Sequence, residues 1–295
     1  MSTPASTTTK QPSTPSEPTS APSRKRGGSA GGTAFTVLTW ALALIFFFPV
    51  FWMALTGFKN EADAYTETPR LFFAPTLTQF QNVLDEATPF AVNSLVATTA
   101  STILVVLLAL PAAYALSIRP VKKTQDVLFF FISTKMLPLV AVIVPLYVIV
   151  GQIGALDNIW VMIVLYTAMN LPIAVWMMRS FLQEIPGEVL EAAEMDGAGL
   201  VKVWRHVMIP MTAPGIAATA LICVIFAWNE FFFAVNLTAS ASSTVPVYLV
   251  GFIASQGLYF AQLSAAATLA SLPVVIAGWI AQKQLVRGLS MGAIK

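Results

Sequence analysis

Residues 92–117 read VNSLVATTASTILVVLLALPAAYALS, a long run without a charged side chain. A helix of this length rises about 1.5 Å per residue and can cross the roughly 30 Å hydrocarbon core of a bilayer. Inside lipid, every backbone N–H and C=O has to find its partner within the protein, and a helix meets that requirement. The run therefore predicts a transmembrane helix.

The rest of the chain repeats this pattern. Of its 295 residues, 57% are hydrophobic and only 10% are charged, whereas soluble domains carry about 25% charged residues. Internal prolines such as Pro138, Pro145 and Pro172 are tolerated in a membrane bundle, because neighbouring helices satisfy the freed carbonyls. The sequence predicts an all-α polytopic membrane protein with six transmembrane helices, near residues 34–56, 92–117, 127–150, 158–180, 210–236 and 261–281.

The segment 1–33 differs from everything that follows. It is rich in Ser, Thr and Pro and ends in a basic and glycine-rich stretch, so it has little apolar surface to bury. The apolar stretch after it is long and lacks an A-x-A-like cleavage site, which argues against a secretory signal. We therefore expect a disordered cytoplasmic tail over 1–33 and a membrane domain over 34–295.

The distribution of positive charge predicts the orientation. If both termini lie in the cytoplasm, 13 of the 16 lysines and arginines fall inside, the outer loops receive only Lys59 and Arg70, and Lys135 falls within a span. This agrees with the positive-inside rule, and two cytoplasmic termini require an even number of spans. Residues 57–91 are then predicted to form an extracytoplasmic loop and residues 181–209 a cytoplasmic one.

The sequence argues against several chemical functions. A single cysteine, Cys223, and a single histidine, His206, are too few for a usual zinc site or for nucleophilic catalysis in the membrane. No G-x-x-x-x-G-K-[ST] run is present, so the chain has no P-loop for ATP. We expect no catalytic residue, metal or cofactor on this chain. An ion-coupled secondary transporter remains an alternative, although only Glu230 supplies a carboxylate within a span and no internal repeat is evident.

The cytoplasmic loop carries the most specific pattern. Residues 181–210 read FLQEIPGEVLEAAEMDGAGLVKVWRHVMIP, which predicts a short helix, a glycine break and a second helix. Val189, Ala192 and Ala193 are predicted to form a narrow apolar face, fringed by carboxylates that disfavour contact with an anionic lipid surface. Such a helix suits a groove on a soluble partner, and it is predicted to end at Gly197 and Gly199, which can take positive φ.

Two motifs within this framework resemble a known family. The run Glu191-Ala192-Ala193-x-x-Asp196-Gly197-Ala198, followed by Pro210 and Pro214, resembles the EAA loop of ABC-importer permeases. The run FAWNEFF at 226–232 resembles the W-N-E-F signature of carbohydrate permeases of the maltose type, and KMLP at 135–138 also fits. The six-span form is similar to the smaller of the two paired permeases, and the third span is most similar to sorbitol and mannitol transporters.

The resemblance implies a fold, partners and a mechanism. It implies a type I ABC importer permease in the bacterial plasma (inner) membrane, which pairs with a second permease, two ATP-binding subunits and an extracytoplasmic solute-binding protein. ATP and Mg²⁺ would be bound by the partner subunits, and alternating access would carry a sugar or polyol, with another solute such as glycerol phosphate left open. The residues that would couple to the ATPase are Glu191, Ala192, Ala193, Asp196 and Gly197.

Polar residues within the spans are candidates for the solute path. Such groups are costly in lipid and tend to face a cavity or a neighbouring helix, and sugar hydroxyls need hydrogen-bond donors and acceptors. Asn229 and Glu230 could instead bridge helices, and Lys135 could extend its amine toward the interface. The predicted path residues are Trp228, Asn229, Glu230, Asn170 and Lys135.

Overall fold

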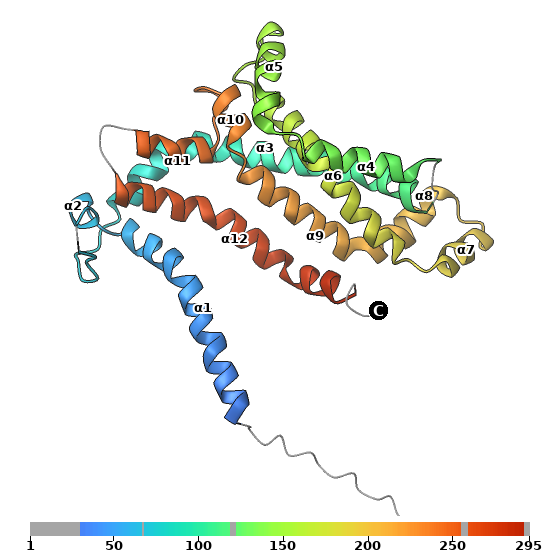
Figure 1. The fold of residues 1–295 in the computed structure, drawn as a ribbon, viewed down its shortest axis with the longest axis horizontal. Helices are drawn as coiled ribbons and strands as arrows, with labels where there is room; N and C mark the ends of the chain where they lie inside the picture. The colour runs from blue at the N-terminus through green and yellow to red at the C-terminus, as the bar shows by residue number, and fades with distance from the viewer. Residues whose placement is uncertain (1–29, 67, 119–121, 255–258, 292–295) are drawn as a thin grey trace, which may run out of the picture. The chain divides into compact units, whose positions relative to one another are not determined.

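The computed structural model describes residues 30–66, 68–118, 122–254 and 259–291. Most of the predicted tail, residues 1–29, therefore lies outside the described residues. The chain divides into two units, Met1–Pro49 and Val50–Lys295. The described part is built from helices, which in chain order are α1 Ala30–Gly57, α2 Glu61–Ala64, α3 Thr78–Ser117, α4 Thr124–Lys135, α5 Leu139–Gln152, α6 Ile159–Gln183, α7 Gly187–Met195, α8 Leu200–Val203, the π-helix η1 Trp204–Met208, α9 Ile209–Trp228, α10 Phe232–Leu237, α11 Val245–Ala254 and α12 Phe260–Met291 (Figure 1).

The number of helices able to span a membrane is close to the predicted six. Among the described residues five helices are long and apolar enough, and the number rises to six if α4 and α5 together make one span. The five lie at 32–57, 78–117, 159–183, 200–228 and 260–282. The helix that contains the second predicted span begins at Thr78, so residues 78–91 of the predicted outer loop are helical.

The third apolar segment is broken in the middle. α4 and α5 meet at an angle of 86°, with Met136, Leu137 and Pro138 between them. Proline has no N–H to donate and disfavours helical backbone in the residue before it. Pro111, Pro145 and Pro172, in contrast, lie inside continuous helices. The break therefore separates the segment that the sequence predicted as one span into two helices.

Three helices form the centre of the second unit. α3 packs along α6, and α9 contacts both of them and α12. Small side chains sit at these interfaces, including the fully buried Ala97, Ala109 and Ala174, and they allow helices in a membrane to approach closely. Gly215 of α9 faces the ring of Phe181 so closely that a Cβ atom at position 215 would overlap the ring.

The two ends of this bundle carry different structures. α6 is followed by α7 and α8 at one end, whereas α10 and α11 lie near the other end of α6 and α9 (Figure 1). Beside the latter end, Glu61 of α2 accepts backbone N–H groups from Ala261 at 3.0 Å and Gln262 at 2.9 Å. This carboxylate satisfies two donors at the start of α12, which have no partner within the helix itself.

Candidate functional site

The predicted coupling segment folds as a short helix followed by a sharp turn. α7 begins after Pro186, and its end is closed by Gly197, which has φ +70°. The N–H of Ala198 donates to the carbonyl of Ala193 at 3.0 Å, a bond pattern typical of helices that end in a left-handed glycine. The positive φ predicted for Gly197 is confirmed. Gly199, the second glycine that could take positive φ, has φ −65° instead and stands at the N-terminus of α8.

α7 has one face toward the bundle and one face toward solvent. Leu190 and Ala193 pack against a buried cluster formed mainly by α3 and α6, to which α4, α8, η1 and α9 also contribute. Ala192 is exposed, as a face that docks to a partner requires, but Ala193 packs inward, so the predicted face of Val189, Ala192 and Ala193 does not form one outward surface. Met195 is 88% exposed, which places an apolar side chain on the outward surface.

Glu191 and Ala192 lie on this outward surface with Met195, and Asp196 and Gly197 at the end of α7 are also exposed. The structure therefore leaves four of the five predicted coupling residues exposed at one end of the bundle. Acidic and small side chains there leave the backbone accessible to a partner. Ala193 is the exception, because its methyl group is used inside the protein.

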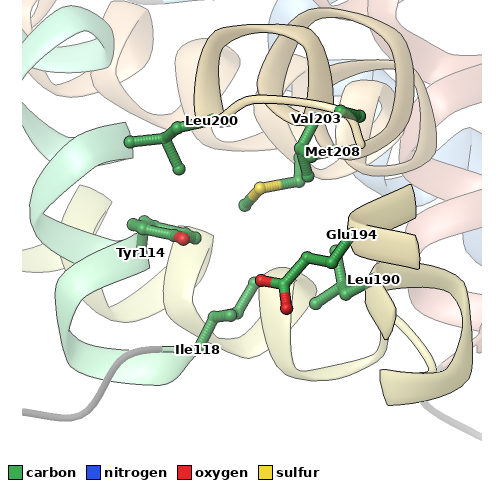
Figure 2. Close-up of a pocket in the computed structure, with 8 residues that line it drawn as sticks. Tyr114, Ile118, Leu190, Glu194, Leu200, Val203 and Met208 are labelled. Atoms are coloured by element: carbon green, nitrogen blue, oxygen red, sulfur yellow. The ribbon is translucent and has the colours of Figure 1, made fainter. Parts of the chain in front are cut away.

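A cavity of about 160 Å³ separates α7 and α8 from the end of α3. Figure 2 shows Tyr114, Met208 and Glu194 pointing into the space, with Ile118 and Leu190 beside them. Protein interiors are normally packed to high density, and contacts are lost wherever a void replaces a neighbouring atom. Leu190 and Glu194 of α7 border the space, so this helix is not fully packed against the end of α3.

Trp228, Asn229 and Glu230 mark the point where α9 ends. The Trp228 indole is buried and donates to the carbonyl of Ala270 at 3.0 Å. The Glu230 carboxylate is also buried and accepts the N–H groups of Phe233 at 2.8 Å and Ala234 at 3.3 Å. Glu230 thus caps α10, in the manner of acceptors at helix N-termini.

Asn229 is the exposed member of this trio, and its amide donates back to the carbonyl of Ile225 at 2.8 Å. A hollow of about 280 Å³ lies next to Trp228 and Asn229 and is lined mainly by apolar side chains of α11 and α12. Ser271 adds a hydroxyl to this lining. The hollow offers apolar contact and few polar groups from this chain.

Asn170 and Lys135 both approach α9. Asn170 is fully buried, and its amide lies 3.5 Å from the carbonyl oxygen of Cys223. Lys135 is exposed at the end of α4, and its Nζ lies 5.8 Å from the centroid of the Phe226 ring. Trp228, Asn229 and Glu230 therefore lie at the end of α9 or directly after it. Asn170 and Lys135 approach the same part of α9, from Cys223 onward. Within the described residues no group of three or more His, Cys, Asp or Glu side chains could hold a metal.

A residue that the sequence did not single out organises the opposite end of the bundle from α7. Asp157 has a left-handed backbone, with φ +55°, and its carboxylate accepts N–H groups from Ala239 and Ala241 at 2.9 Å and from Ser242 at 2.8 Å. The Ser242 hydroxyl donates to the Asp157 carbonyl at 2.9 Å. The Asp157 N–H donates to the carbonyl of Leu237, also at 2.9 Å.

Partial burial acts to raise the pKa of the Asp157 carboxyl, but the backbone N–H groups together lower this pKa below its ordinary value of 3.8. A lowered pKa in the folded state stabilises the fold above the pKa of the unfolded chain, and this contribution is lost as the pH falls through the folded pKa. We therefore expect amide protection of residues 238–245 in lipid nanodiscs, measured by hydrogen exchange and corrected for intrinsic rates, to stay constant between about pH 8 and about pH 5. Loss of protection by about pH 5 would contradict the assignment of an ionised, fully bonded carboxylate.

The comparisons with known proteins agree on one family. Residues 105–291 match the family described as "Binding-protein-dependent transport system inner membrane component". The chain is 38% identical over 264 residues, 88% of this chain and 95% of the relative, to the "Probable ABC transporter permease protein y4oR" of Sinorhizobium fredii. It is 30% identical over 254 residues, 84% of this chain and 91% of the relative, to the diacetylchitobiose uptake system permease protein DasC of Streptomyces coelicolor.

A solved structure has the same fold. It is a chain from a bacterial ABC transporter involved in the import of the acidic polysaccharide alginate, and it superimposes with a TM-score of 0.69 at 24% sequence identity. The match covers 89% of this chain and 99% of that chain. This chain therefore shares its arrangement of helices with a chain of that transporter.

Proposed function

This chain belongs to the family of inner membrane components of binding-protein-dependent transport systems, and from this premise we propose that it is one of two permeases that form the path of a carbohydrate ABC importer. As a family member it is a multi-pass membrane protein and a transport subunit. The proposal adds the class of solute, the coupling residues and the set of partners.

The observation that carries the proposal is the exposed end of α7. Glu191, Ala192 and Met195 face outward, and the left-handed Gly197 closes the helix sharply. α7 follows α6 after a short link, Glu184 to Pro186. A displacement of α7 is therefore transmitted to a membrane helix. We assign this end as the docking site for a nucleotide-binding subunit, which would bind ATP and Mg²⁺ in place of this chain.

Only a partner that interacts differently with two states can shift the equilibrium between them. The cavity behind α7 leaves room for a second pose of that helix. In alternating access, the ATPase subunits would favour one pose when they close around ATP and the other after hydrolysis. The membrane helices would then open toward the outside or toward the cytoplasm.

The proposed solute is a sugar or polyol. The relative from Streptomyces coelicolor is named for uptake of diacetylchitobiose, a carbohydrate. The candidates for contact from this chain are Asn229, which is exposed, and Trp228, Glu230, Asn170 and Lys135 at or near α9. The apolar lining of the hollow beside Asn229 fits a division of labour in which the second permease supplies much of the hydrogen bonding to the solute.

We propose that both termini and α7 lie in the cytoplasm and that residues 238–245 lie outside, in six spans. Met195 and Ser240 are exposed, and the native Cys223 is fully buried. On intact cells, a membrane-impermeant maleimide should label a Ser240→Cys variant but spare a Met195→Cys variant, and inside-out vesicles should reverse the pattern. Labelling of Met195→Cys on intact cells would sink the proposed orientation.

The function is tested with the complete importer in proteoliposomes. The expected result is accumulation of a radiolabelled sugar or sugar alcohol that requires ATP, the binding protein and this chain together. Uptake that follows an imposed ion gradient without ATP would support a secondary transporter instead. Uptake of glycerol phosphate in preference to sugars and polyols would contradict the proposed solute class.

A further inference from the structure

Residues 238–245, called the clamped segment from here on, form a turn with an exposed tip and a buried base. Ala239, Ser240 and Ala241 are exposed, whereas the four residues from Ser242 to Val245 are each less than 8% exposed. The run TASASST at 238–244 has small side chains and no charge. Hydroxyls and small methyl groups suit close approach of another protein surface rather than contact with hydrocarbon.

The clamped segment is held from two sides. On one side the Asp157 carboxylate accepts three of its N–H groups, at 2.8 to 2.9 Å. On the other side the amide of Asn93 in α3 donates to the carbonyls of Ala241 at 2.9 Å and Ser243 at 3.0 Å. These bonds join parts of the chain that lie far apart in the sequence, so the shape of the tip is imposed by the bundle.

Asp157 connects the clamped segment to one helix in particular. It lies just before α6, and Asn158 between them caps α6 by accepting the N–H of Trp160 at 2.9 Å. α6 has 25 residues and is therefore about 37 Å long. Its far end leads into α7 through the short link Glu184 to Pro186. A displacement of the clamped segment therefore acts directly on the helix that carries the coupling segment.

We infer that Asp157 is a positioning residue for transport, which ties the contact surface for the extracytoplasmic binding protein, the clamped segment, to α6 and through it to α7. The inference rests on the proposed function. The family is binding-protein-dependent, so an exposed and rigid surface at the end of the bundle opposite α7 is where such a protein has to act. Binding of that protein to the clamped segment would then be coupled, through Asp157 and α6, to a change in the pose of α7.

The test measures ATP hydrolysis by the complete importer in nanodiscs, with and without its own binding protein purified with the solute that it carries. The variants are Asp157→Asn and Asp157→Gly, because Asn and Gly both tolerate positive φ and the backbone is kept while the carboxylate is lost. We expect the ratio of stimulated to unstimulated hydrolysis to fall by about tenfold in both, as a coupling free energy of ordinary size would allow.

Two matched variants separate coupling from stability. Asp85→Asn removes an exposed negative charge from α3, in the part assigned to the outer side, and is expected to keep the wild-type ratio. Asn158→Ala removes the cap of α6 and leaves the clamp in place, so it should lower the thermal stability and keep the ratio. If both Asp157 variants fail to assemble, Ser242→Ala removes only the hydroxyl bond to the Asp157 carbonyl and should lower the ratio by less.

The outcomes distinguish the two proposals. If ATP hydrolysis by the wild-type importer does not respond to the binding protein, the result contradicts the proposed function. A responsive wild type with an unchanged ratio in Asp157→Asn, or in Ser242→Ala where that variant stands in, would overturn the inference alone. A fall in the ratio that Asn158→Ala matches would also overturn it, because loss of helix stability would then explain the effect.

Discussion

Gly197→Asp is expected to abolish uptake while the protein still inserts into the membrane. Gly197 has φ +70°, and a Cβ atom added to it would have no neighbouring atom within 4 Å, so the substitution does not disturb the inside of the bundle. It adds a carboxylate to the outward surface of the coupling turn and a cost of about 1 kcal/mol for a side chain in left-handed backbone. A central interface position often contributes about 2 kcal/mol or more, which is about thirtyfold in affinity.

The measurement is uptake by the complete importer, together with the amount of ATPase subunit that co-purifies with this chain. Gly199→Asp is the matched control, because Gly199 has φ −65° and open space around it; it adds the same charge without backbone strain, and we expect a smaller loss. Wild-type uptake by the Gly197→Asp variant would remove the assignment of α7 as the coupling helix.

Gly215→Ala is expected to destabilise the membrane bundle itself. The added methyl group would overlap the Phe181 ring, where α9 meets the end of α6. Overpacking of this kind costs about 1–3 kcal/mol, because the ring or the helix has to move. The expected result is a lower midpoint of thermal unfolding for the purified protein in detergent and a lower yield from membranes.

A double-mutant cycle tests the stated cause. When Phe181→Ala has removed the ring, Gly215→Ala should cost almost nothing further, so the two effects should be strongly non-additive. Gly278→Ala is the matched control, since Gly278 lies in α12 with no atom near its Cβ position; it should be neutral or slightly stabilising. Additive losses at 215 and 181 would show that the close contact is not the source of the instability.

The coupling segment was predictable because its signals are local. A proline before the helix, acidic residues along it and a glycine after it act within one or two helical turns, and α7 and Gly197 follow from them. The membership of its apolar face was not predictable in the same way. Val189, Leu190, Ala192 and Ala193 are all small or apolar, and only the packing of Leu190 and Ala193 against the bundle decides which of them face inward.

The clamp at Asp157 could not be read from the chain for a different reason. Its partners in the clamped segment are distant in the sequence, and an aspartate in a short polar stretch between apolar segments has no periodicity that marks it. The available signal was the run Gly154 to Asn158, in which an Asp next to an Asn suits left-handed backbone. The break between α4 and α5 had a clearer local signal in Pro138, but Pro145 and Pro172 lie within helices. A proline alone therefore does not decide between a continuous and a broken helix.

The π-helical turn η1 between α8 and α9 rotates the side chains of one helix about the axis relative to those of the other. Each residue of an α-helix advances about 100° around the axis, so a turn that contains one residue more shifts every later side chain by about that angle. The side chains of α8 are thus not in line with the side chains by which α9 contacts α3 and α6. Deletion of one residue from 204–208 would leave α8 and α9 helical but would rotate α8, with Leu200, about the helix axis relative to α9. Such a variant would test the orientation of α8 separately from the stability of the two helices.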